Sequence, residues 1–317
     1  MTEEYRLERL NEINIKDLKV LYQTAYAENR AHEYTRRKFE TGRIGGANFA
    51  FLAYDKNNVL AGFYALFPVE ITINRGKALA GQVADPMIHP LHRNTGLFFK
   101  LVDHTHQFAA SRGMKLIFSF LYGTDGLYPV FLRYFDFVEK ESLNGYYIKV
   151  PTLPIYRHIQ RNKFFRFIYK VYYKLVTKMF IKEGGYFKLF NSNVEYDEIV
   201  KDENFINYKC GYSSCKVWEL KNVKLLVKIN PNGSIGVGDV DKNPPEEIKR
   251  AIARLKVISF LLGIRFIHIE ASHGHILDKI LSARYPGIKN RYVLYLKLDE
   301  KIEIDSVKFT FADIDTF

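Results

Sequence analysis

The stretch VADPMIHPLHRNTGLFFKL, from Val83 to Leu101, decides the fold of the N-terminal half of the chain. It joins a strand-like run, a short basic loop containing Gly96, and an amphipathic helix. The first backbone N–H groups of such a helix are unpaired, and together with the helix dipole they attract phosphate oxygens. Gly96 removes a side chain where the backbone must approach a ligand, and Arg93 adds a cation. We therefore predict a pyrophosphate-binding loop.

Two common phosphate loops are excluded by their spacing. The chain has no GxxxxGK[ST] segment and no GxGxxG segment after a strand. Neither a nucleotide-hydrolysing P-loop nor a dinucleotide fold is therefore indicated.

Around this stretch, the hydrophobic periodicity predicts the order β-α-α-β-β-β-α-β-α-β for the first 150 residues. The expected elements are a strand near 5–10, helices after Asn14 and over 34–40, strands over 49–54, 59–74 and 78–88, a helix over 96–112, and a strand over 115–120.

The loop resembles the pyrophosphate loop of the GNAT superfamily of N-acetyltransferases, and His89-Pro90 matches the HP-x-x-R form common in its bacterial members. FLRYFDF, at 131–137, resembles the family's helix-to-strand signature after the fifth strand. The resemblance covers about 150 residues and implies acetyl-CoA as the cofactor. The cofactor-binding residues that it implies are Met87, Ile88, His89, Arg93, Asn94, Thr95, Gly96, Leu97 and Phe98. Family members often have Gly or Ala where this chain has Phe98.

The resemblance also implies how the chemistry is arranged. The pantetheine arm is expected between parallel strands at 84–88 and 116–120, with a main-chain N–H near Met87 or Ile88 polarising the thioester carbonyl. The family position that usually holds the general acid, a tyrosine, is Leu132 in this chain, and the neighbouring tyrosines are Tyr128 and Tyr134. We propose Tyr128, because it begins the helix near the expected sulfur. The candidate bases are Asp85 on the fourth strand, and Glu33 with its neighbour His32 in the helical region that usually lines the acceptor pocket.

The length fits two domains. We expect a GNAT acyl-CoA-binding catalytic domain at 1–150, a basic amphipathic helical linker at 151–190, and a degenerate GNAT-like domain at 191–317. The fold class is therefore α/β (α+β), with a mixed, mostly antiparallel sheet flanked by helices and a second, smaller α/β domain. The junction GVGDVDKNPPEEIKRA, at 236–251, is acidic and lacks the Arg-x-x-Gly loop, so no second CoA site is predicted. His268, Glu270, His273 and His275 lack a known ligand spacing, and no metal site is predicted.

The segment 161–182 carries basic residues at four-residue steps and apolar residues on another face. One interpretation is peripheral contact with an anionic membrane surface. The other, which we favour at this stage, is a linker helix that packs its apolar face on the protein and leaves its lysines in solvent.

Composition limits the location and the partners. The N-terminus has no signal-peptide pattern, no apolar run is long enough to span a membrane, and Cys210 and Cys215 suit reduced thiols. We expect a cytoplasmic protein, peripheral to the inner membrane surface if 161–182 binds lipid. The net charge of +12 attracts acidic partners in general, but we expect no nucleic acid.

The leading hypothesis is an N-acetyltransferase that acts on a small primary amine, with an aminosugar in surface-polysaccharide synthesis as the first acceptor to test. One alternative is an aminoacyl-tRNA-dependent transferase of the peptidoglycan-bridge type. Another is a non-catalytic membrane-surface or scaffold protein on the same fold. The tail that ends at Phe317 is a further hypothesis, because some two-domain relatives place a C-terminal carboxylate in the active site.

Overall fold

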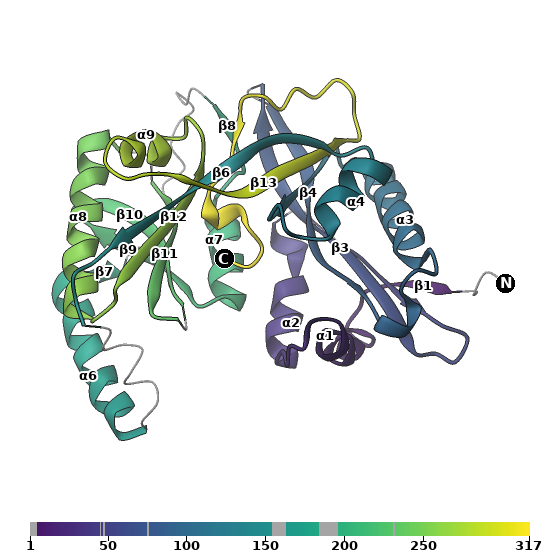
Figure 1. The fold of residues 1–317 in the computed structure, drawn as a ribbon, viewed down its shortest axis with the longest axis horizontal. Coiled ribbons are helices and arrows are strands. Elements are labelled where there is room, and N and C mark those ends of the chain that lie inside the picture. The colour runs from purple at the N-terminus through teal and green to yellow at the C-terminus, as the bar shows by residue number, and fades with distance from the viewer. Residues whose placement is uncertain are drawn as a thin grey trace. The chain divides into compact units, whose positions relative to one another are not determined.

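The structure is a computed structural model that describes residues 5–44, 46, 48–74, 76–153, 163–183, 196–230, 232–241 and 243–317 (Figure 1). The chain divides into two compact units. Unit 1 contains Met1–Lys140, Asp197–Val200 and Val293–Ser306, and unit 2 contains Glu141–Tyr196, Lys201–Tyr292 and Val307–Phe317.

Unit 1 is a mostly antiparallel sheet covered by helices. Its strands, in spatial order, are β1 (Arg6–Arg9), β2 (Phe49–Tyr54), β3 (Leu60–Ile73), β4 (Gly76–Ile88) and β5 (Leu116–Leu121). All neighbours are antiparallel except β4 and β5, which are parallel. The helices are α1 (Leu18–Tyr26), α2 (His32–Phe39), α3 (Leu97–Ser111) and α4 (Leu127–Tyr134), with short 3₁₀ turns at Ile15–Asp17, Thr41–Arg43 and Pro90–His92. With β6 (Val138–Lys149) next in the chain, the predicted order of elements is confirmed.

The sheet of unit 1 is buried on both faces, which explains the continuous apolar runs of its strands. Along β2, Phe49 and Phe51 face a cluster that includes Leu97 and Leu101 of α3. The alternate residue Leu52 faces a second cluster formed with α1 and with the end of α2. Helices α3 and α4 therefore cover one face of the sheet, and α1 and α2 cover the other.

Unit 2 repeats the strand pattern of unit 1. Its strands are β9 (Cys215–Leu220), β10 (Val223–Ile229), β11 (Ser234–Val240) and β12 (Phe266–Ser272), with β7 (Lys182–Glu183) beside β9. They pair antiparallel, antiparallel and then parallel, as β2 to β5 do in unit 1. Helices α6 (Lys163–Phe180), α7 (Glu203–Tyr212), α8 (Pro245–Leu261) and α9 (Ile276–Ser282) accompany them. The helix α8 connects the parallel pair as α3 does in unit 1.

The last strand of each repeat is assigned to the other unit. Residues 143–149 of β6 pair with β12 in unit 2. The later part of β13 (Ile288–Lys297) belongs to unit 1, where Leu294 enters the core and the N–H of Leu298 donates to the carbonyl of Lys115 at 2.9 Å. The sheet of each unit is thus completed by residues from the other sequence repeat.

Several features differ from the expectations or were not predicted. The helix α7 and the short strands β8 (Asp197–Glu198) and β14 (Val307–Lys308) were not predicted, and the tail adds a 3₁₀ turn at Phe311–Asp313.

The interpretation that the 161–182 helix packs its apolar face on the protein is wrong for α6, because Ile168, Val171, Leu175 and Met179 are exposed. Residues 161 and 162 and the side chain of Phe164 lie outside the described part. No helix of that part is long and apolar enough to cross a membrane.

Candidate functional site

The parallel strands β4 and β5 of unit 1 pair over only three residues each. Ala80, Gly81 and Gln82 pair with Leu116, Ile117 and Phe118. Both strands continue beyond this point, to Ile88 and Leu121, without further pairs between them among the described residues. The strands therefore separate after Gln82 and Phe118, so the splay expected at 84–88 is observed, whereas residues 116–118 of the expected stretch 116–120 are paired.

A bulge in β4 sets the direction of the following backbone groups. Asp85 has a positive φ of 46°, and the register between β3 and β4 shifts between Phe63 and Ala65. Beyond the bulge, the N–H of His89 donates to Ala61 of β3 at 2.8 Å. Successive residues of a strand direct their N–H groups to opposite edges, so the N–H of Ile88 faces away from β3 and toward the β5 side. Of the two expected donors, Ile88 therefore has the suitable direction, whereas Met87 faces β3.

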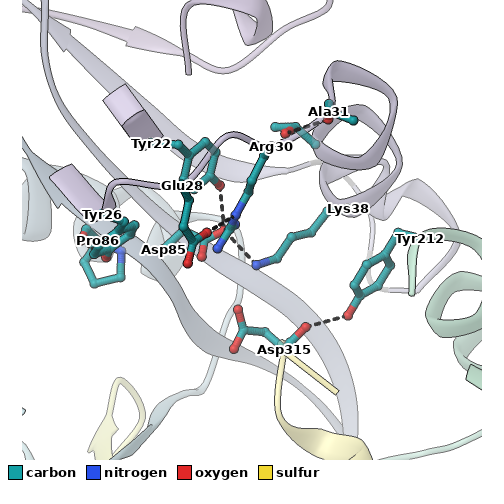
Figure 2. A network of polar contacts seen from close by, with 11 residues as sticks. Tyr22, Tyr26, Glu28, Arg30, Ala31, Lys38, Asp85, Pro86, Tyr212 and Asp315 are labelled. Atoms are coloured by element: carbon teal, nitrogen blue, oxygen red, sulfur yellow. Dashed lines mark hydrogen bonds and ion pairs between the residues drawn. The ribbon is translucent and has the colours of Figure 1, made fainter. Parts of the chain in front are cut away.

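The bulge is held by a buried network around Asp85 (Figure 2). Its Oδ2 accepts hydrogen bonds from the Tyr22 hydroxyl at 2.7 Å, the Lys38 ammonium at 2.7 Å and Arg30 at 3.1 Å. The Tyr26 hydroxyl donates to the carbonyl of Pro86, the next residue of the bulge, at 2.5 Å. These contacts tie α1, α2 and the segment between them to β4.

The protonation of Asp85 follows from these partners. Burial opposes its ionisation, but the charges of Lys38 and Arg30 outweigh burial and lower the pKa of the carboxyl below its ordinary value. An ionised carboxylate with three donors on one oxygen is suited to holding the bulge. No sequence pattern predicts the network, because its members come from distant positions and Lys38 is one of several basic residues in α2.

The predicted phosphate loop lies between β4 and α3. Its backbone turns at Asn94, with φ of 63°, and at Gly96, with φ of 79°. The Tyr5 hydroxyl donates to Thr95 Oγ1 at 3.2 Å and lies 3.0 Å from His92 Nδ1. The Thr95 hydroxyl in turn donates to the His92 carbonyl at 2.8 Å. Tyr5, which sequence reasoning missed, thus braces the loop, and the His89 side chain accepts from the Leu91 N–H at 3.3 Å.

The start of α3 is open to an anion. Gly96 is the N-cap residue, and no side chain caps the helix. A Cβ at Gly96 would meet no atom within 4 Å, so the positive φ rather than crowding favours glycine there. The first backbone bond of the helix runs from Lys100 to Gly96, which leaves the amides of the first turn available to a ligand. Arg93, beside them, is exposed.

The side chains of Leu97 and Phe98 pack into the core and do not cover the free amides at the start of α3. Leu97 is buried in the unit 1 core. The ring of Phe98 lies 6.3 Å from Phe131 and 5.8 Å from Phe135 of the α4 region, measured between centroids. The large residue at the position where the family often has Gly or Ala is thus directed into the core.

The candidate acid and the second candidate base lie on different helices. Tyr128 is half-buried in the first turn of α4, and its hydroxyl donates to Glu139. Glu33 is exposed near the start of α2, where hydrogen bonds from Arg36 and Arg37 lower its pKa to about 2. Its neighbour His32 is also exposed. Because α2 and α4 cover opposite faces of the sheet, the structure does not gather Glu33 and Tyr128 into one cluster.

In unit 2, the C-terminal tail packs on the parallel strand pair that corresponds to β4 and β5. The tail residue Thr310 bridges to Ala271 of β12, and the rings of Phe311 and Phe317 lie against Gly236 and Gly238 of β11. Lys201 forms buried ion pairs with Asp239 and Asp313, each at 2.9 Å. These acidic and aromatic groups thus lie along the β11–β12 pair, and the absence of a second CoA site stays a prediction.

The histidines of unit 2 have protein partners. His268 Nε2 lies 3.0 Å from Glu270 Oε1, and its ring stacks on Tyr147. In the part of the chain that the structure describes, no group of three or more His, Cys, Asp or Glu residues is arranged to hold a metal ion.

Comparisons with known proteins agree with this geometry. Residues 6–137 match the family model described as an acetyltransferase (GNAT) domain. No curated protein matches the chain.

Several solved structures share the fold. A protein from Enterococcus faecalis V583, described as a "Probable N-Acyltransferase", matches with a TM-score of 0.62 and 12% identity over 93% of this chain and 73% of that one. A GCN5-related N-acetyltransferase from Kribbella flavida gives 0.58 and 12%, over 92% and 71%. Another from Anabaena variabilis ATCC 29413 gives 0.56 and 11%, over 93% and 73%.

At such low identities the solved structures establish the fold alone, whereas the family model identifies a stretch of sequence. That stretch contains β1 to β5, the bulge at Asp85, the loop and α3. Residues 6–137 of the chain therefore match the acetyltransferase (GNAT) domain in sequence, and the solved structures show the same fold.

Proposed function

We propose that unit 1 is an acyl-CoA-dependent N-acyltransferase that moves an acetyl group from acetyl-CoA to a primary amine. One observation carries the proposal: an uncapped, glycine-started helix follows a bulged strand that separates from its parallel neighbour. The open amides suit a pyrophosphate, and the separated strands suit an extended arm.

The residues present fit this cofactor. The first-turn amides of α3, from Leu97 and Phe98, and the exposed Arg93 would hold the phosphates. Asn94, Thr95 and Gly96 would shape the loop, with His89 at its start. Met87 and Ile88 would line the thioester end. Acetyl-CoA supplies an acyl group that is activated as a thioester.

The residues of the chain have separate tasks in this proposal. The N–H of Ile88 is fixed by the strand and serves as a donor to the oxygen on which negative charge develops, so its alignment costs no reorganisation. Tyr128 serves as the proton donor to the leaving thiolate. Asp85 positions the bulge. Asp85 and Glu33 both have lowered pKa values, so each is a weak proton acceptor at neutral pH.

The acceptor and the compartment are parts of the same proposal. The first acceptor to test is an aminosugar of surface-polysaccharide synthesis, on the strength of the family resemblance. We assign the enzyme to the cytoplasm, because Cys210 and Cys215 are free thiols and thus suit a reducing compartment.

The experiment combines calorimetry with acetyl-CoA and release of free thiol across a panel of amines. Arg93→Ala should raise the Kd for acetyl-CoA about tenfold, the usual scale for a charged hydrogen bond. The matched control is Arg112→Ala, at the other end of α3, which should leave the Kd unchanged. Absence of acetyl-CoA binding by the wild-type chain would refute the proposal, as would equal effects of the two variants.

A further inference from the structure

The helix α6 of unit 2 presents three separate faces. Tyr169, Tyr173, Val176 and Phe180 recur at helical spacing and are buried or half-buried. The Tyr169 and Tyr172 hydroxyls donate to the carbonyls of Leu262 and Leu261, each at 2.8 Å. This first face fixes α6 on the end of α8.

The second face of α6 is apolar and exposed. Its members are Ile168, Val171, Leu175 and Met179, at steps of three and four residues. Leu175 is 57% exposed and Met179 is 75% exposed. A contiguous exposed apolar stripe is uncommon on a soluble monomer and marks a contact surface.

The third face is cationic. Lys170, Lys174 and Lys178 are exposed at four-residue steps. From Lys163 to Lys182 the sequence has six basic residues and no acidic residue. A solvent-exposed helix face usually carries acidic residues among its lysines, and the two pair at i,i+4 spacing. The helix α6 contains no acidic residue.

The apolar surface continues beyond the helix. A cavity of about 680 Å³ is lined by Tyr172 of α6, Phe260 at the end of α8, and Leu153. Leu153 is 74% exposed and Phe260 is 52% exposed. Lys149 and Arg265 also line this cavity, so that apolar and basic side chains lie together here too.

We propose that the α6 surface, formed by Lys163–Phe180 with Leu153 and Phe260, docks unit 2 on a lipid bilayer that carries anionic headgroups. Apolar side chains enter the boundary between headgroups and acyl chains while the adjacent lysines meet lipid phosphates. A nucleic acid would use the lysines but would leave the stripe of Ile168, Val171, Leu175 and Met179 in water. A second copy of the chain would bring two faces of the same charge together. The proposal is independent of acetyl transfer.

The first test is sedimentation of the full chain with vesicles of neutral lipid, alone or with about one third anionic lipid. Binding should require anionic lipid and should weaken as salt is raised. The triple variant Lys170→Glu, Lys174→Glu, Lys178→Glu should bind on the order of 100-fold more weakly, because each basic residue near an anionic surface contributes about fivefold. The matched control is Lys16→Glu, Lys19→Glu, Lys56→Glu, which makes the same charge change on exposed residues of unit 1 and should keep most of the binding.

A second test reports the apolar contact itself. Trp218 is the only tryptophan of the chain and is 2% exposed, so it provides a constant background. In Leu175→Trp, the new indole should be quenched by brominated acyl chains in anionic vesicles, whereas Trp218 in the wild type should not.

Three outcomes would overturn the proposal. The first is equal binding of the two charge-reversal variants, and the second is an indole at 175 that brominated lipid does not quench. The third is a concentration-dependent dimer, seen by light scattering, that Leu175→Ser abolishes, because a second copy would then occupy this surface.

Discussion

The Lys38 ammonium lies 2.7 Å from Asp85 Oδ2, and the lysine side chain is completely buried. Removing one partner of a buried pair leaves an uncompensated charge, which costs about 3–5 kcal/mol. Asp85→Asn should therefore lower the free energy of unfolding by that amount in urea titrations. Glu33→Gln, which breaks only exposed pairs, should leave the midpoint unchanged. An Asp85→Asn protein of normal stability and no turnover would instead assign Asp85 to proton transfer.

His106 should make unit 1 sensitive to acid. It is buried in α3 beside the Tyr64 hydroxyl at 3.0 Å, and burial lowers its pKa from 6.5 to about 4. Between these values the unfolded chain binds a proton that the folded chain does not, so the free energy of unfolding falls as pH falls from about 6.5 to about 4. The loss between pH 7 and pH 5 should be about 2 kcal/mol. His106→Gln should remove this part of the pH dependence, and an unchanged slope in that variant would contradict the assignment.

Tyr5→Phe should loosen the phosphate loop without unfolding the domain. It removes the hydroxyl that bridges Thr95 and His92 and keeps the ring in the core. We expect about a fivefold rise in the Kd for acetyl-CoA, measured by calorimetry, since one hydrogen bond of about 1 kcal/mol is lost. Stability should fall by no more than that. An unchanged Kd would show that the loop keeps its shape without Tyr5.

If Tyr128 is the proposed proton donor, Tyr128→Phe should lower kcat about 100-fold, because the variant loses the hydroxyl and keeps the ring. The KM for acetyl-CoA should stay within about twofold, as Tyr128 does not belong to the phosphate loop. Tyr134→Phe is the control, because it lies on the same helix and is 61% exposed. Equal rates for the two variants would remove Tyr128 from the mechanism.

Ile88→Pro removes the proposed backbone donor, and the neighbouring His89 bond to β3 can remain. Proline also replaces the Ile88 side chain and restricts φ, so thermal unfolding must first show that the variant folds. If the N–H stabilises developing charge, kcat should fall about 100- to 1,000-fold. Ile88→Val keeps the N–H in a smaller side chain and should retain activity near that of the wild type. The Kd for acetyl-CoA in both variants separates lost chemistry from lost binding, and near-normal turnover by Ile88→Pro would refute the role.

Much of unit 1 could be predicted because its signals are local. The strand at 49–54 is confirmed to the residue as β2, and the helix predicted over 96–112 is observed as Leu97–Ser111. These elements alternate apolar stretches with turn residues, which periodicity detects. The loop after β4 was found because its glycine and cations are adjacent in sequence.

What was missed depends on distant residues or on weak periodicity. Lys38 and Arg30 meet Asp85 only because the chain returns through α1 and α2 to β4, and no spacing in the sequence encodes that return. The helix α7 has buried residues on most sides, including Phe205, Ile206 and Tyr208, so it lacks a clear amphipathic stripe. The apolar stripe of α6 was predicted from its helical periodicity. Periodicity alone could not show that the stripe is exposed, because a stripe buried in a protein core has the same spacing.

The assignment of the later part of β13, from Val293, to unit 1 bears on how the chain can be divided experimentally. A fragment that stops after β6 would lack Val293–Lys297, the residues that lie along β5, and would leave that strand with an open hydrogen-bonding edge. Such an edge recruits other chains. Expression of this N-terminal fragment alone should therefore give aggregates, and a soluble single-domain version would need a transplanted copy of the later part of β13.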